Sequence, residues 1–136
     1  MGELISRGLV IRQPWMGHIL RGEKRWELRS RSTTLRGPIA LIQSGSGLVV
    51  GTACLARVIG PLQDGEFERA TKEGLVVGTE FQAISYAKAY AWVLEQARPL
   101  ATPLPYDHPQ GAVIWVRLPE ALQNRLAASF SGPDSA

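Results

Sequence analysis

A lysine, a glutamate and an arginine occur at close spacing in one short segment of the chain. Residues 22–29 read Gly-Glu-Lys-Arg-Trp-Glu-Leu-Arg, which places Lys24, Glu27 and Arg29 in the pattern Gly-x-Lys-x-x-Glu-x-Arg. An ammonium and a planar guanidinium can bind phosphate or the polar edge of a base. A carboxylate can position the ammonium or accept a hydrogen bond from an amino group. The segment therefore predicts a site for an anion or a nucleoside.

The same side chains also suit proton transfer. Lys24 and Glu27 would then be the acid–base pair of a small hydrolase. Glu27 and Arg29 lie two residues apart in an expected strand over residues 25–31, so they share its charged front, with an apolar back. Lys24 precedes the regular strand, and turn geometry decides its direction. The sequence leaves both roles of Lys24 open.

The elements before this segment are expected to be a short strand and a helix. Residues 8–12 form the strand, and Pro14 suits the first turn of the helix. Trp15 lies at the start of this helix, where it either stacks a base or packs in the core. Gly22 ends the helix in the manner of a glycine beyond the C-cap.

The rest of the chain predicts more strands and a few helices around one core. Strands are expected at residues 39–43, 48–62, 90–94 and 112–118, and helices at 64–73, 79–88 and 119–130, before a frayed tail at 131–136. The proline-rich residues 98–109 are expected at a sheet edge. We expect one α+β domain over residues 1–136, a small mixed β-barrel of five to six strands with flanking helices.

Positive charge is concentrated near the N-terminus. The formal net charge is +3, but residues 1–36 hold eight Lys/Arg against three acids, a local charge of +5. The remaining residues hold seven against nine, or −2. A local basic surface suits an anionic partner, and RNA or a nucleoside is the expected one.

The sequence shows no pattern typical of a disulfide-bonded, metal-binding or membrane protein. The single cysteine, Cys54, cannot form an internal disulfide, and His18 and His108 are isolated, so neither a metal site nor a cofactor is expected. No apolar run approaches the roughly 20 residues that cross a bilayer, and the first residues lack a leader pattern. We therefore expect a cytoplasmic protein without a membrane partner.

Motifs along most of the chain resemble a known family. They are Ile11-Arg12-Gln13-Pro14-Trp15, Gly22-x-Lys24-x-x-Glu27-x-Arg29, Arg36-Gly37-Pro38, Trp92–Glu95, Arg98-Pro99-Leu100, Pro105-Tyr106 and Gly111. Over about residues 7–118 this pattern is similar to the ASCH domain, a relative of the PUA fold. The resemblance implies a small barrel with a cleft between the barrel and its helices, lined by the motif residues.

The resemblance also implies an RNA-binding or RNA-modifying function. Characterised members include a hydrolase that removes the acetyl group from N4-acetylcytidine, which uses the motif lysine, a threonine and a distant glutamate. Lys24 matches that lysine, but Glu27 stands at the position of the threonine, so a hydroxyl nucleophile is absent there. That hydrolytic mechanism is therefore not expected to transfer unchanged.

The sequence as a whole predicts a domain that binds RNA or a modified nucleoside in a basic cleft. The residues expected to contact the ligand are Arg12, Gln13, Trp15, Lys24, Arg29 and, from the loop at residues 44–47, Ser44. The alternative is a hydrolase of a nucleoside amide or an RNA phosphodiester with Lys24 and Glu27 as catalytic pair. A third possibility is a protein-interaction module that uses residues 98–109.

Overall fold

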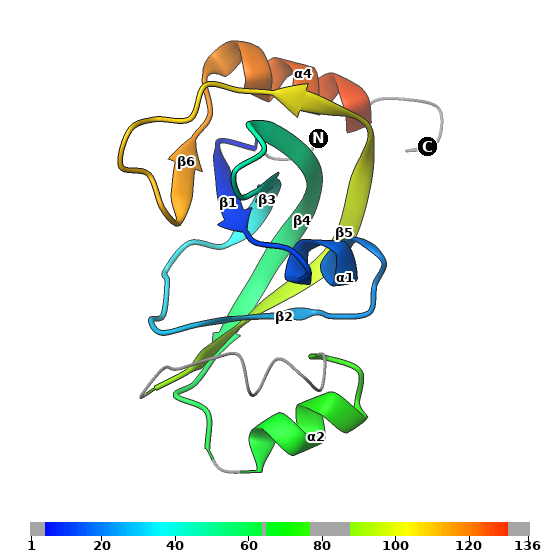
Figure 1. The fold of residues 1–136 in the computed structure, drawn as a ribbon, viewed down its shortest axis with the longest axis vertical. Coiled ribbons are helices and arrows are strands. Elements are labelled where there is room, and N and C mark those ends of the chain that lie inside the picture. The colour runs from blue at the N-terminus through cyan, green and yellow to red at the C-terminus, as the bar shows by residue number, and fades with distance from the viewer. Residues whose placement is uncertain (1–4, 64, 77–87, 131–136) are drawn as a thin grey trace.

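The computed structural model describes residues 5–63, 65–76 and 88–130 (Figure 1). Its elements are β1 (Arg7–Ile11), α1 (Trp15–Leu20), β2 (Trp26–Arg29), β3 (Gly37–Gln43), β4 (Leu48–Ile59), α2 (Glu66–Lys72), β5 (Tyr90–Pro105), β6 (Trp115–Arg117) and α4 (Glu120–Phe130). The helix expected at 79–88 lies almost entirely outside the described residues, as does the tail at 131–136.

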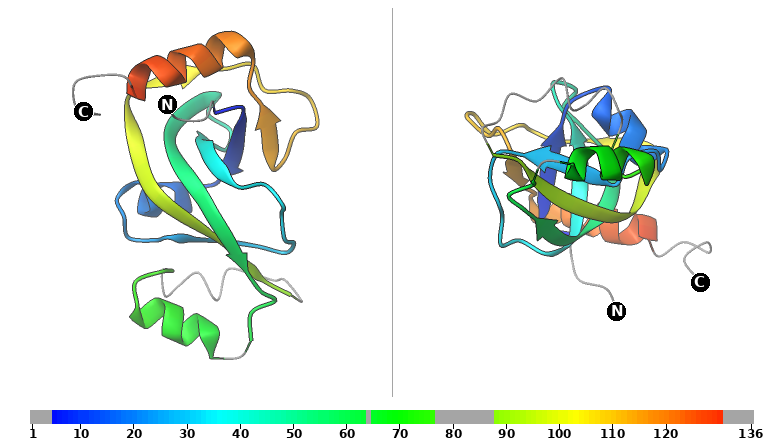
Figure 2. Two further views of the ribbon diagram at one scale, coloured as in Figure 1. Left: turned by 180° about the vertical axis from the view of Figure 1, so that it is seen from behind. Right: turned by 90° about the horizontal axis from the view of Figure 1, so that it is seen from below.

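The six strands form one curled sheet, in agreement with the expected mixed α+β barrel. Their order is β2-β5-β4-β3-β1-β6. β1 runs parallel to β3, and the other neighbouring pairs are antiparallel. Seen from below, the sheet curves around a central core, and helices lie outside it (Figure 2). The sheet is therefore a half-barrel rather than a flat layer.

The curvature is introduced in the long strands β4 and β5. Their register shifts at three places, one of them between Val49 and Gly51. A Cβ atom on Gly51 would lie 2.6 Å from the carbonyl oxygen of Arg98, so the two backbones approach more closely there than another residue type allows. Bulges of this kind bend a strand and increase its twist. The strand β4 therefore bends at Gly51.

The proline-rich segment continues β5 instead of forming a separate loop. β5 pairs with β2 through residues 90–93 and with β4 as far as Pro105. Pro99 and Pro105 therefore lie in the part of β5 that pairs with β4 on one side. The pairing of β5 with β2 on the other side ends before these prolines. Proline lacks the backbone donor that a second ladder would need. The strand expected at 112–118 is shorter than predicted, because β6 begins at Trp115.

Each helix covers a separate part of the sheet. Met16 and Ile19 of α1 pack in a cluster with residues of β1, β3, β4 and β5. Leu122 and Leu126 of α4 close a second cluster at the β1–β3–β6 end, and Ala70 of α2 packs on β2 and β5. In the described ranges, every helix is too short or too polar to span a bilayer.

Side chains bridge the gap between edge strand β2 and the other end of the sheet. The guanidinium of Arg29 in β2 donates to the carbonyl oxygen of Val10 in β1 at 2.6 Å. Trp92 of β5 stacks on Trp115 of β6, with ring centroids 5.8 Å apart and planes 13° from parallel. The charged motif thus lies at the seam where the curled sheet meets itself.

Candidate ligand-binding site

The turn that precedes Lys24 is a helix C-cap of the Schellman type. Gly22 has φ 77°. Its amide donates to the carbonyl of Ile19 at 3.1 Å, and the amide of Glu23 donates to the carbonyl of His18 at 2.8 Å. These are the two bonds of the motif, and they require a left-handed residue after the cap. The glycine signal in the sequence is therefore confirmed, and it sets where Glu23 and Lys24 leave the helix.

Replacement of Gly22 by alanine is expected to lower the free energy of unfolding by about 1 kcal/mol. Apart from its chain neighbours, no heavy atom of the described residues lies within 4 Å of a Cβ built on Gly22, so the cost is backbone strain and not a clash. A urea denaturation curve would measure it. A variant as stable as the wild type would contradict the left-handed conformation at this turn.

Lys24 points into the protein rather than into solvent. It is 1% exposed. Its Nζ donates a hydrogen bond to the carbonyl oxygen of Trp26 and lies 3.7 Å from Oε1 of Glu27. The same atom is 5.9 Å from the centroid of the Trp15 ring. The turn therefore directs the ammonium back over Glu27, one of the directions left open by the sequence.

Glu27 lies between the two cations. Its Oε1 faces Lys24. Its Oε2 accepts a hydrogen bond from Nε of Arg29 at 2.9 Å and forms an ion pair with a terminal nitrogen of the same guanidinium at 2.8 Å. The Arg29 guanidinium also lies 5.7 Å from the Trp92 ring, a cation–π contact. The predicted same-face pair of Glu27 and Arg29 is present, and it joins Lys24 in one network.

The expected charged front of β2 is not a solvent surface. Glu27 is 6% exposed, and Trp26 and Leu28 on the opposite face are buried as well. The reason is long-range: residues of α2 and β5 cover the apolar face, and the charged face turns toward β1 at the seam. The predicted alternation of charged and apolar side chains is present, and Glu27 on the charged side is buried while Arg25 and Arg31 are exposed.

Two other predicted ligand residues flank this network. Trp15 is partly exposed and lies beside the Lys24 ammonium. Gln13 is exposed, but both ends of its amide contact the protein: Oε1 accepts from the amide of Gly17 at 3.0 Å, and Nε2 donates to Gln43 at 3.1 Å. Trp15 thus has a surface to offer a ligand, whereas Gln13 ties α1 to the end of β3.

The other two predicted ligand residues, Arg12 and Ser44, lie on the surface outside the network. Arg12 and Ser44 are exposed, and the backbone amide of Ser44 donates to the carbonyl of Ile11 at 3.0 Å. No side-chain bond from either to Lys24, Glu27 or Arg29 occurs in the part of the chain that the structure describes. A surface depression of about 560 Å³ lies elsewhere, between β6 and α4, and no motif residue lines it.

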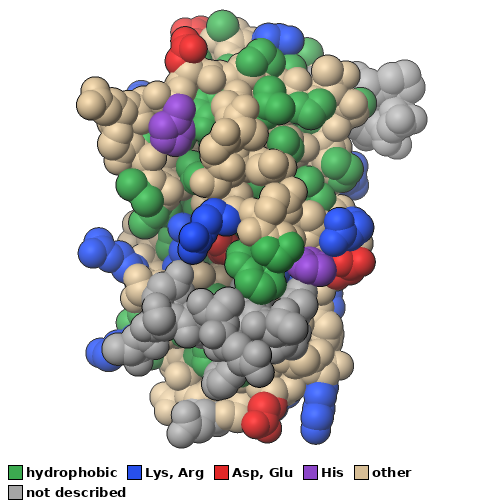
Figure 3. All heavy atoms as spheres, in the orientation of Figure 1, with side chains coloured by type: hydrophobic (Ala, Val, Ile, Leu, Met, Phe, Trp, Pro, Cys, Tyr) green, Lys and Arg blue, Asp and Glu red, His purple; other side chains and the backbone are tan. Residues whose placement is uncertain are grey.

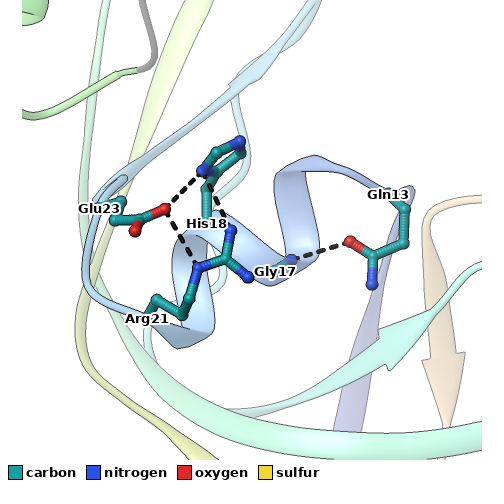
Figure 4. Close-up of polar contacts among 5 residues, drawn as sticks. All are labelled: Gln13, Gly17, His18, Arg21 and Glu23. Carbon is teal, nitrogen blue, oxygen red and sulfur yellow. Dashed lines mark hydrogen bonds and ion pairs between the residues drawn. The ribbon is translucent and has the colours of Figure 1, made fainter.

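His18 has a carboxylate partner that the sequence analysis missed. Its Nδ1 lies 2.7 Å from Oε1 of Glu23, and Nε of Arg21 donates to the same oxygen at 3.2 Å (Figure 4). The Schellman turn brings residues 18 and 23 together, so the glycine that follows the C-cap, Gly22, is the residue in the sequence that indicates this contact. Within the described ranges, no three His, Cys, Asp or Glu side chains lie close enough together to hold a metal ion.

The hydrogen bond with His18 is the main reason that the pKa of Glu23 lies below its ordinary value of 4.5; desolvation opposes this shift, and Arg21 reinforces it. A depressed carboxyl pKa adds stability above the unfolded pKa, and that stability is lost as pH falls through the folded value. We expect an NMR titration of the Glu23 carboxyl carbon to show the low midpoint, and His18→Phe to raise it toward 4.5. An unchanged midpoint in that variant would contradict the pairing.

The fold is thus a mixed sheet curled into a half-barrel, with helices outside it and the charged motif at its seam. A profile of the ASCH domain matches residues 9–104, and the chain belongs to this family. No protein of curated function matches the sequence.

Solved structures of one bacterial protein share the fold. The ASCH protein of Zymomonas mobilis superimposes with a TM-score of 0.66 at 17% identity, covering 90% of this chain and 93% of that one. Two single-residue variants of it give 0.62 and 0.63, also at 17% identity, and cover 94% and 90% of this chain and 98% and 96% of theirs. At this identity the likeness concerns the fold.

Proposed function

We propose that this ASCH domain binds RNA or a modified nucleoside beside the network of Lys24, Glu27 and Arg29. The observation that carries the proposal is the position of Lys24. Its ammonium is buried, held by Glu27 and the Trp26 carbonyl, and next to the partly exposed Trp15 ring. A cation beside an aromatic platform suits a base with its phosphate.

Stability alone is a poor explanation for this network. Lysine and glutamate are seldom fully buried, because removal of a charge from water costs more than an ion pair usually returns. Apolar residues of similar volume would often hold the core as well. Folding stability therefore does not explain why Lys24 and Glu27 are buried in this small domain. We propose that ligand recognition does.

The surrounding surface supports an anionic ligand. Of the eight basic residues in positions 1–36, six are exposed: Arg7, Arg12, Arg21, Arg25, Arg31 and Arg36. Basic side chains, hydrophobic side chains and a histidine gather at the level of α1 and β2 on one face of the molecule (Figure 3). Exposed arginines of this kind would contact phosphate and guide the approach of the nucleic acid.

The binding role is favoured over the hydrolase with a Lys24–Glu27 pair. A general base needs a free lone pair within reach of the proton that it takes. Both oxygens of Glu27 already face cations, Lys24 on one side and Arg29 on the other. The pair is therefore better arranged to hold a fixed charge than to exchange protons.

The test is a fluorescence-anisotropy titration of a mixed-sequence single-stranded RNA at several salt concentrations. We expect saturable binding whose logarithm of affinity falls linearly with the logarithm of salt, by about 0.7 for each phosphate contact. Absence of saturable binding, or an affinity independent of salt, would overturn the proposal. A nucleoside without phosphate, titrated by calorimetry, separates base recognition from phosphate contact.

A further inference from the structure

The hydrogen position on His18 follows from its partner. An ionised carboxylate only accepts hydrogen bonds, so an Nδ1 atom 2.7 Å from Oε1 of Glu23 must carry the hydrogen. The terminal nitrogen of Arg21, 3.4 Å from the same Nδ1, is then a neighbour and not a donor to it. A neutral imidazole with hydrogen on Nδ1 presents a lone pair at Nε2.

The His18 ring lies beside the proposed site. The His18 ring is 6.2 Å from the Trp15 ring, centroid to centroid, and tilted by 34°. Trp15 in turn has the Lys24 ammonium 5.9 Å from its centroid. The His18 side chain is 24% exposed, and its Nε2 has no hydrogen-bond partner among residues 5–63, 65–76 and 88–130. The Trp15 ring thus has both the His18 ring and the Lys24 ammonium as neighbours.

We infer that His18 is a specificity-determining residue, whose Nε2 accepts a hydrogen bond from the N–H edge of a nucleobase stacked on Trp15. The inference rests on the proposed function. Every common base offers an N–H on its pairing edge and a π-face for stacking. Glu23 is the positioning residue, because it fixes both the tautomer and the orientation of the ring.

A role in stability accounts poorly for the same contacts. Arg21 and Glu23 are about half exposed, at 59% and 51% of their side chains. Exposed ion pairs of this kind contribute little to folding. The helix terminus is already closed by backbone hydrogen bonds from Gly22 and Glu23. The orientation of His18 by Glu23 is therefore better explained by a contact between Nε2 and the proposed ligand.

The test compares oligoribonucleotides with matched analogues that lack the edge donor. The pairs are adenine and purine, cytosine and pyrimidin-2-one, guanine and N1-methylhypoxanthine, and uracil and N3-methyluracil. For at least one pair we expect the wild type to bind the parent base about three- to tenfold more tightly, the size of one hydrogen bond. His18→Phe keeps a flat ring without nitrogen and is expected to bind both members alike.

Each result decides between the two proposals. If the wild type binds RNA but never distinguishes a parent base from its analogue, or if folded His18→Phe keeps the preference, the role of His18 is overturned and the proposed function stands. If neither an oligoribonucleotide nor a nucleoside binds, the proposed function fails, and the role of His18 with it. Glu23→Ala, which leaves Nε2 in place but releases the ring, is expected to weaken the preference without abolishing binding.

Discussion

Replacement of Glu27 by glutamine is expected to lower the free energy of unfolding by about 3–5 kcal/mol, because it removes the anion between the buried Lys24 and the half-buried Arg29. Glutamine keeps the shape of the side chain, so the loss would come from charge and not from a cavity. Lys24 and Arg29 would remain 0% and 17% exposed, each having lost its contact with that carboxylate. Urea denaturation followed by tryptophan fluorescence would measure the change.

Glu95→Gln is the matched control for this prediction. Glu95 also faces an arginine, Arg57, but at 4.0 Å and with both side chains more than half exposed. Its loss is expected to leave the denaturation midpoint nearly unchanged, since exposed pairs contribute about 0–1 kcal/mol. If Glu27→Gln were as mild as Glu95→Gln, the buried network would not depend on the Glu27 charge.

Local spacing predicted the contact between Glu27 and Arg29 but not their burial. Two residues on one face of a strand meet regardless of the rest of the fold, and this contact followed from the alternation. Burial depends on segments distant in sequence. Leu75 accepts hydrogen bonds from the amides of Arg25 and Trp26, and Val10 accepts from Arg29 across the seam. No periodicity within residues 25–31 contains that information.

The turn at Gly22 also predicts a contact between His18 and Glu23, which the spacing arguments did not include. Gly22 predicted the end of α1, and a Schellman turn places the residue two beyond the C-cap against the residue three before it. In this chain those residues are Glu23 and His18, so their 2.7 Å contact could have been predicted from Gly22 alone. The two residues are five apart and fit none of the usual helical pairings, which is why spacing arguments passed over them.

The burial of Lys24 also decides which substitution tests it. An arginine would keep the charge, but its larger head would overpack a site that is 1% exposed. Methionine is unbranched and of similar length, and it fills irregular gaps in cores. In Lys24→Met, the Glu27 carboxylate would still be held by Arg29.

Lys24→Met is expected to separate folding from function. The Trp26 carbonyl would lose a donor, at a cost of about 1–3 kcal/mol, less than for Glu27→Gln. RNA affinity would fall by about tenfold or more, because the cation beside the Trp15 ring would be lost. Lys72→Met, at an exposed position of α2, removes the same charge and should change affinity less than about twofold, because salt screens distant exposed charges. RNA binding by Lys24→Met at the affinity of the wild type would show that the buried ammonium serves the fold alone.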